Sequence, residues 1–176
     1  MAHLRKWCSY RRKERPYTRI SKYRKKSYIR MSPSLKIVRF DMGDQKREFS
    51  CTLDIHTKQI AQIRQNAIES GRQSANRLLE KHLGKNDYYF KIRIYPFHII
   101  RENPLAAGAG ADRMSTGMQR AFGKPIGIAA QVRKGQNIAT MRFDSQHLAI
   151  AKNAARRFTT KLPIVCRVVV TQHQKA

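Results

Sequence analysis

Alternation of hydrophobic and polar residues marks several short segments of this chain as β-strands. In residues 49–55, Phe49, Cys51, Leu53 and Ile55 occupy every second position, so they lie on one face of a strand. Comparable runs occur elsewhere, and we predict strands at about residues 35–40, 49–55, 88–100, 126–133, 136–143 and 164–170.

Turn-forming residues separate these predicted strands. Residues 41–44 predict a turn after the first strand, and the Lys134-Gly135 pair predicts a hairpin between the strands at 126–133 and 136–143. Pro96 lies inside the run from 88 to 100, where it breaks the hydrogen-bonded ladder or lies at an edge or a bend.

Two segments have the three- and four-residue spacing of amphipathic helices. The longer one runs from about Lys58 to Leu83, with Thr57 as the expected N-cap and Gly84 as the expected C-cap. Its predicted apolar stripe consists of Ile60, Ile63, Ala67, Gly71, Ala75, Leu78 and Leu79, and its opposite face carries Arg64, Arg72 and Arg77. The shorter helix is expected at about residues 145–158.

Interleaved strands and helices predict an α+β fold in which two helices pack on one side of a largely antiparallel sheet. At 176 residues the chain is long enough for one hydrophobic core and short for two. We therefore expect a single globular domain at residues 35–172, preceded by an arm at residues 1–34.

The charge of the chain points to a polyanionic partner. Lys and Arg number 37 and Asp and Glu number 11, so the formal net charge is 37 − 11 = +26 at pH 7. Such an excess repels itself unless a polyanion neutralises it. Nucleic acid fits best, because guanidinium groups pair with phosphates and stack on bases. The alternative, an unusually soluble basic domain, normally mixes both signs of charge.

The arm combines cations with tyrosines and contains one acid, Glu14. Cations bind phosphates, and flat rings stack on unpaired bases, so we expect the arm to become ordered on RNA. A disordered basic tail is the alternative, although such tails are usually poor in aromatic residues. The RNA-binding residues expected here are Arg11, Arg12, Arg15, Tyr17, Arg19, Lys22, Arg24, Lys25, Lys26 and Arg30.

A second candidate site is the Gly- and Ala-rich segment at residues 103–125. Loops this long within one domain are usually functional or disordered, and small residues allow close approach to a crowded partner. A P-loop is excluded, because five residues rather than four separate Gly117 from Gly123 and Pro125 follows Lys124. We expect a tip at Gly108, Ala109, Gly110 and Ala111, and RNA contacts from Arg101, Arg113, Arg120 and Lys124, with Arg101 directing the loop through phosphate hydrogen bonds. The alternative is a flexible surface loop.

Other site chemistries find little support in the sequence. Cys8, Cys51 and Cys166 are scattered without a metal-binding spacing, and His98 is expected to be packed or to face RNA. The aspartates occur singly, so we expect no metal, no cofactor and no catalysis, which argues against an RNA-processing enzyme. A DNA-compacting protein is also disfavoured, because both helices are better explained as packing on a sheet. No apolar run suggests a membrane span or a signal peptide, so a cytosolic protein is expected.

Five segments of the sequence are similar to one known family. They are, in order, residues 16–19 (PYTR), 36–43 (KIVRFDMG), 95–101 (YPFHIIR), 109–118 (AGADRMSTGM) and 121–127 (AFGKPIG). Together they resemble the universal L-sixteen family of large-subunit ribosomal proteins, in the archaeal and eukaryotic form called L-ten-e. The short tail after the last predicted strand is more like that of an archaeal member.

The resemblance implies a fold of the α/β-hammerhead type and a structural role in the large ribosomal subunit. It further implies that the chain binds large-subunit rRNA near the aminoacyl-tRNA site, with the loop after Arg101 pointing towards the peptidyl transferase centre and bound tRNA. Neighbouring ribosomal proteins are implied as further partners of a chain that is monomeric within the cytoplasmic ribosome.

Overall fold

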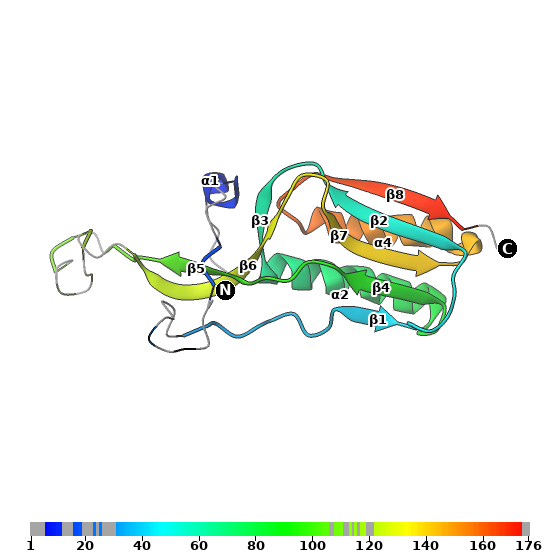
Figure 1. The fold of residues 1–176 in the computed structure, drawn as a ribbon, viewed down its shortest axis with the longest axis horizontal. Helices are drawn as coiled ribbons and strands as arrows, with labels where there is room; N and C mark the ends of the chain where they lie inside the picture. Colours follow the sequence, from blue (N-terminus) through cyan, green and yellow to red (C-terminus); the bar gives the residue numbers. More distant parts are fainter. Residues whose placement is uncertain are drawn as a thin grey trace.

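A computed structural model describes residues 6–11, 16–18, 23, 25, 31–105, 108–110, 113, 115, 117–118 and 122–173. Helices α2 and α4 and two antiparallel sheets make up most of this part of the chain (Figure 1). The elements are α1 (Trp7–Arg11), β1 (Asp41–Gly43), β2 (Cys51–Thr57), β3 (Ala61–Arg64), α2 (Gln65–Leu83), β4 (Tyr88–Ile92), β5 (His98–Glu102), β6 (Lys124–Val132), β7 (Asn137–Phe143), the 3-10 turn η2 (Ser145–His147), α4 (Leu148–Thr160) and β8 (Cys166–Gln172).

The larger sheet has the strand order β1-β4-β7-β2-β8, and all its neighbouring strands are antiparallel. In β2, Cys51, Leu53 and Ile55 are fully buried, as their alternation predicts. Across the sheet, Leu53 pairs with Met141 on one side and with Val170 on the other. The inner face of this sheet is therefore apolar and forms one wall of the core.

Helices α2 and α4 cover that apolar face (Figure 1). The two helices approach each other closely at Gly71, where an added Cβ would lie 3.0 Å from the ring of Phe158. Phe158 in turn meets Phe90 of the sheet edge-on, with ring centroids 5.8 Å apart. The α+β class with two packed helices is thus confirmed, and Gly71 allows the close contact between the two helices.

The smaller sheet has the order β3-β6-β5 and projects beyond the helices (Figure 1). Strands β5 and β6 form the projecting hairpin, in which Ile99 pairs with Ile128 and Glu102 with Lys124. A bulge lies between Ile100 and Arg101. Bulges bend a strand and redirect its side chains, so this one helps to set the direction in which the segment after β5 leaves the body.

Two connections that lead from one sheet to the other lie side by side next to Thr57. Strand β2 leads to β3 there, and β6 leads to β7. The amide of Gly135 donates to the carbonyl of Thr57, and the amide of Thr57 donates to the carbonyl of Gln136. The predicted Lys134-Gly135 turn exists, with φ +79° at Gly135, but the predicted hairpin is wrong because its two strands belong to different sheets.

Three element boundaries also differ from the sequence expectation. The first predicted strand at 35–40 is irregular, and residues 41–43 of the turn expected at 41–44 form strand β1 instead. The long helix begins at Gln65 with Arg64 as N-cap, because residues 61–64 pair with β6. The predicted strand at 88–100 is two strands, β4 and β5, separated at residues 93–97 around Pro96. Gly84 is the C-cap of α2, as predicted, with φ +77°.

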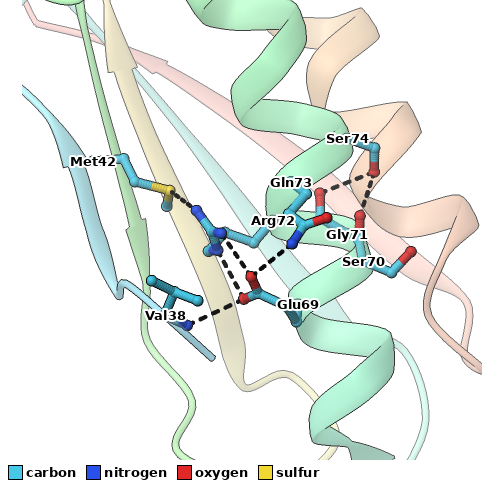
Figure 2. Close-up of polar contacts among 8 residues, drawn as sticks. All are labelled: Val38, Met42, Glu69, Ser70, Gly71, Arg72, Gln73 and Ser74. Atoms are coloured by element: carbon cyan, nitrogen blue, oxygen red, sulfur yellow. Dashed lines mark hydrogen bonds and ion pairs between the residues drawn. The ribbon is translucent and has the colours of Figure 1, made fainter. Parts of the chain in front are cut away.

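Side chains of α2 hold the irregular segment before β1 against the body (Figure 2). The amide of Lys36 donates to Gln65 Oε1 at 2.8 Å, and the amide of Val38 donates to Glu69 Oε2 at 3.4 Å. Glu69 also accepts two hydrogen bonds from Arg72, at 2.8 and 2.6 Å. Arg72 is 9% exposed, so the prediction that it lies on the solvent face is wrong.

Candidate nucleic-acid interface

Most described cations lie at the surface, whereas the acids are largely occupied by partners within the chain. Among the described residues, ion pairs join Arg47 to Asp87 and Asp144, Arg72 to Glu69, and Lys91 to Asp41. The carboxylate of Asp54 accepts from Asn137 and Thr140. Exposed cations include Lys36, Arg39, Arg77, Arg93, Arg113, Lys124, Arg142, Lys152, Arg156, Arg157 and Arg167. This distribution leaves the surface strongly positive, which favours binding to phosphates.

Arg101 joins the basic arm to the projecting hairpin. Its guanidinium carbon lies 4.5 Å from the ring centroid of Tyr17 and 4.0 Å from that of Phe122. The two rings meet edge-on, with centroids 5.2 Å apart. Cation–π contacts use the faces of a guanidinium and leave its N–H groups at the edge. The arrangement is therefore compatible with a phosphate hydrogen bond from the same side chain.

Tyr17 is also fixed through its backbone to the free edge of the smaller sheet. The amide of Tyr17 donates to Nδ1 of His98 at 2.9 Å, and its carbonyl accepts from the amide of Ile99 at 2.8 Å. The Tyr17 ring packs on the small apolar cluster of Ile99 and Ile128. His98 is thus a packed residue, one of the two roles expected for it.

The two ends of the Gly- and Ala-rich segment meet where β5 ends and β6 begins. Gly123 has φ +83°, and a Cβ there would lie 2.8 Å from the carbonyl carbon of Glu102. A side chain cannot be accommodated so close to backbone, so glycine permits this approach. The Asn103 side chain donates to the carbonyl of Gly117 at 3.1 Å and closes the base further.

The predicted tip residues Gly108, Ala109 and Gly110 are all exposed. Gly108 and Gly110 have φ of +116° and +97°, a region that side chains strongly disfavour. The amide of Arg113 donates to the carbonyl of Gly110 at 3.0 Å, and the Arg113 side chain is exposed. Lys124 is exposed at the start of β6. Ala111 and Arg120 lie outside the described residues.

Two described pieces of the arm, α1 and the segment around Tyr17, lie against the body. Helix α1 is next to β3 (Figure 1), and a cavity of about 230 Å³ between them is lined by Tyr10, Arg64 and Lys161, among others. Arg11 and Lys25 are exposed. The other arm cations expected to bind RNA lie outside the described residues, namely Arg12, Arg15, Arg19, Lys22, Arg24, Lys26 and Arg30.

Two groups of aromatic residues lie at this surface that the sequence analysis does not predict as candidate site residues. Phe122 is 61% exposed and contacts Arg101. A second group consists of Phe40, Tyr95 and Phe97, whose rings stack in a row. The alternation of Tyr95 and Phe97 around Pro96 could have indicated two rings on the same side of the chain, but the same pattern fits one long strand equally well.

The titratable groups of the described residues do not suggest catalysis. Burial raises the pKa of Tyr88 to about 12 and that of Cys166 to about 11, so both remain protonated at neutral pH and neither is an activated nucleophile. No group of three or more His, Cys, Asp and Glu side chains that could hold a metal ion occurs in the described part of the chain. Within the same residues, no helix is long and apolar enough to cross a membrane.

Comparison with known proteins identifies the family. The model of the family "Ribosomal protein L16p/L10e" matches residues 17–169, a range that extends from Tyr17 through the hairpin to β8. The chain belongs to this ribosomal protein family. The resemblance seen in the sequence is therefore confirmed, and a structural rather than an enzymatic role follows from family membership.

Two archaeal relatives illustrate the similarity. The "Large ribosomal subunit protein uL16" of Methanococcus maripaludis (strain C7) is 44% identical over 152 residues, which cover 86% of this chain and 88% of the relative. The protein of the same name from Archaeoglobus fulgidus is 43% identical over 161 residues, covering 92% of this chain and 89% of the relative. Both relatives agree with the archaeal form that the sequence indicated.

Proposed function

We propose that this chain is a structural constituent of the large ribosomal subunit that binds large-subunit rRNA near the aminoacyl-tRNA site. Family membership supports the ribosomal role in the cytoplasm. The observation that carries the finer proposal is the contact of Arg101 with Tyr17 and Phe122. It fixes a cation-rich arm to the base of the Gly- and Ala-rich segment, so that both can bind one continuous stretch of folded RNA.

In this proposal the arm cations and Arg101, Arg113, Arg120 and Lys124 bind phosphates. The strong charge excess of the chain supports phosphate binding, because neutralisation releases counterions. Irregular rRNA suits this surface, since the arm supplies tyrosines that stack on unpaired bases. Neighbouring ribosomal proteins complete the surroundings of a chain that is monomeric within the subunit.

The Gly- and Ala-rich segment is proposed to reach towards the peptidyl transferase centre and bound tRNA. The exposure of Gly108, Ala109 and Gly110 supports this role, because small residues can enter a crowded site. The tight closure at Gly123 supports it as well, since a fixed base gives the segment a defined direction.

Co-sedimentation tests the ribosomal part of the proposal. The purified full chain should co-sediment with large subunits that have been depleted of it, at moderate salt, and should dissociate as salt rises. Failure to associate at any salt concentration would contradict it.

Shortening the loop tests the tRNA part. Removal of residues 106–111 should leave the thermal unfolding of the domain and its incorporation into subunits unchanged, because Gly108, Ala109 and Gly110, the residues of this segment that the structure describes, are exposed. Translation by the resulting ribosomes should be slower or less accurate. Normal rate and fidelity would show that the segment is a passive surface loop.

A further inference from the structure

Three aromatic side chains form a row at the surface between β1 and the segment that joins β4 to β5. The rings of Phe40 and Tyr95 have centroids 5.4 Å apart with 23° between their planes, and those of Tyr95 and Phe97 are 6.2 Å apart with 22° between planes. Tyr95 is 50% and Phe97 49% exposed. Phe40 is half-buried against the core, whereas Tyr95 and Phe97 leave a large apolar ring surface exposed within the described part of the chain.

The backbone explains why the row is ordered without being buried. Ile94 and Pro96 are buried, so the intervening Tyr95 and the following Phe97 point outwards together, as alternate residues of an extended segment do. Phe40 packs against the core, and its carbonyl accepts from the amide of Ile92 at 2.8 Å. Phe40 thus anchors the inner end of the row, while Phe97 lies at its outer end.

We propose that an unpaired base of large-subunit rRNA stacks on this row, with the Phe97 ring as its contact. This inference rests on the proposed function and adds a base-binding site made of residues that belong neither to the arm nor to the loop. Because the rings are nearly parallel and in contact, the terminal ring presents a flat face. A base can stack on that face as it would on another base.

The surrounding charges favour RNA over a protein as the occupant. Arg39 is adjacent to Phe40 in the chain and exposed, and Arg93 precedes Tyr95 by two residues. The guanidinium of Arg93 is anchored by a hydrogen bond to the hydroxyl of Thr140. A protein interface centred on the row would have to desolvate these cations, and charged residues are depleted from interface centres. A nucleotide instead brings its own phosphate to them.

The first test measures the affinity of the full chain for deproteinised large-subunit rRNA. Phe97→Leu keeps an apolar side chain but removes the flat ring, and Phe97→Tyr keeps the ring. The Kd should rise about 5- to 150-fold for Phe97→Leu, the equivalent of about 1–3 kcal/mol for one stacked base. It should stay near the wild-type value for Phe97→Tyr and for the control Val165→Ala, which alters another exposed apolar residue. Thermal unfolding of each variant establishes that the fold is kept.

The salt dependence of binding separates stacking from charge. The slope of log K against log salt should be the same for Phe97→Leu and wild type, because the substitution removes no phosphate-binding group. If Phe97→Leu binds the rRNA as tightly as wild type, or if Phe97→Tyr weakens binding as much as Phe97→Leu does, the base-stacking proposal is wrong. Either result leaves the proposed function standing. If the wild-type chain itself does not bind the rRNA, the proposed function fails as well.

Ultraviolet cross-linking of intact large subunits provides an independent readout. Mass spectrometry should find a nucleotide adduct on the peptide that contains Tyr95 and Phe97. If a protein cross-linker joins this peptide to a neighbouring protein while RNA adducts occur only on the arm or the loop, the row is a protein contact and the inference is wrong.

Discussion

The guanidinium of Arg101 lies 4.5 Å from the ring centroid of Tyr17, although the two residues are 84 positions apart in the sequence (101 − 17). Tyr17 belongs to the basic arm, and Arg101 lies near the end of β5, just before the Gly- and Ala-rich segment. Phe122, on the return of that segment, has its ring centroid 4.0 Å from the Arg101 guanidinium. One side chain therefore holds three parts of the candidate interface together.

Replacing Arg101 should loosen the arm without unfolding the domain. Arg101→Gln removes the cation–π contacts with Tyr17 and Phe122, each worth about 0.5–2 kcal/mol. Hydrogen exchange of the Ile99 amide should then accelerate, because that amide donates to the carbonyl of Tyr17. Arg113→Gln, which alters an exposed cation of the loop, serves as the control. Unchanged protection of Ile99 in Arg101→Gln would show that the rings do not hold the arm.

The buried face of α2 should determine the stability of the domain. Leu78 is 5% exposed, so Leu78→Ala should lower the free energy of unfolding by about 2–5 kcal/mol. The neighbouring Arg77 is exposed, and Arg77→Ala should change it by less than about 0.5 kcal/mol. Chemical denaturation measures both. Equal, small losses would mean that α2 does not bury this face.

The ion pair of Glu69 and Arg72 should make the domain sensitive to acid. Hydrogen bonds from Arg72 hold the pKa of Glu69 below its usual value of 4.5. Because the pKa is lower in the folded state, ionised Glu69 stabilises the fold above pH 4.5, and that stability is lost as pH falls through the folded-state value. Denaturation curves at several pH values should show this decline for wild type and a shallower one for Glu69→Gln.

At pH 7 Glu69→Gln should cost about 3 kcal/mol or more, because it leaves the buried Arg72 charge unpaired. Asp87→Asn is a matched control. It breaks the exposed pair with Arg47, whose contribution should be less than about 1 kcal/mol. A cost for Glu69→Gln as small as that for Asp87→Asn would contradict the role of Glu69 as a fixed support of the segment before β1.

Gly123 should be required for the closure of the loop base. Gly123→Ala introduces both a disfavoured φ and a clash with the backbone of Glu102. Gly135→Ala is the control, since its φ of +79° is similar but no atom lies within 4 Å of the added Cβ. The control should lose about 1–2 kcal/mol from backbone strain alone. Gly123→Ala should additionally expose the amides at the end of β5 and the start of β6 to hydrogen exchange.

Periodic segments of the sequence predict the core well, and short or mixed segments do not. The alternation of Cys51, Leu53 and Ile55 predicts a strand because each of these residues is buried on the same side. Residues 58–64 fit the predicted helix because Ile60 and Ile63 match its spacing. In the structure Ile63 alternates with Ala61 inside a strand, and Ile60 is 50% exposed. Short apolar runs fit both periods, and only pairing with β6 decides between them.

The sequence predicts those features of the candidate site that depend on charge and composition. It does not predict contacts between residues that are far apart in the chain. The charge excess and the Gly- and Ala-rich segment are visible in the sequence. The cluster of Arg101, Tyr17 and Phe122 is not, because it depends on the arm lying along the edge of β5. The burial of Arg72 is hidden for a similar reason, since its partner Glu69 and the segment before β1 enclose it only in the folded chain.

The central claim, that the arm binds rRNA through its cations, is tested most directly by the salt dependence of binding. One variant changes four arm cations, Arg11, Arg12, Lys13 and Arg15, to Gln. Its matched control changes four cations at the surface of α4 and just after it, Lys152, Arg156, Arg157 and Lys161, to Gln. Both variants keep Tyr17, and both lower the net charge by the same amount.

The slope of log K against log salt is measured for each variant with large-subunit rRNA. Each phosphate that the variant no longer neutralises should reduce the slope by about 0.7–0.9. The arm variant should therefore have a slope shallower than wild type by up to about 3.6 (4 × 0.9), with a smaller change in the α4 variant. A wild-type slope in the arm variant, or an equal reduction in both variants, would contradict the claim.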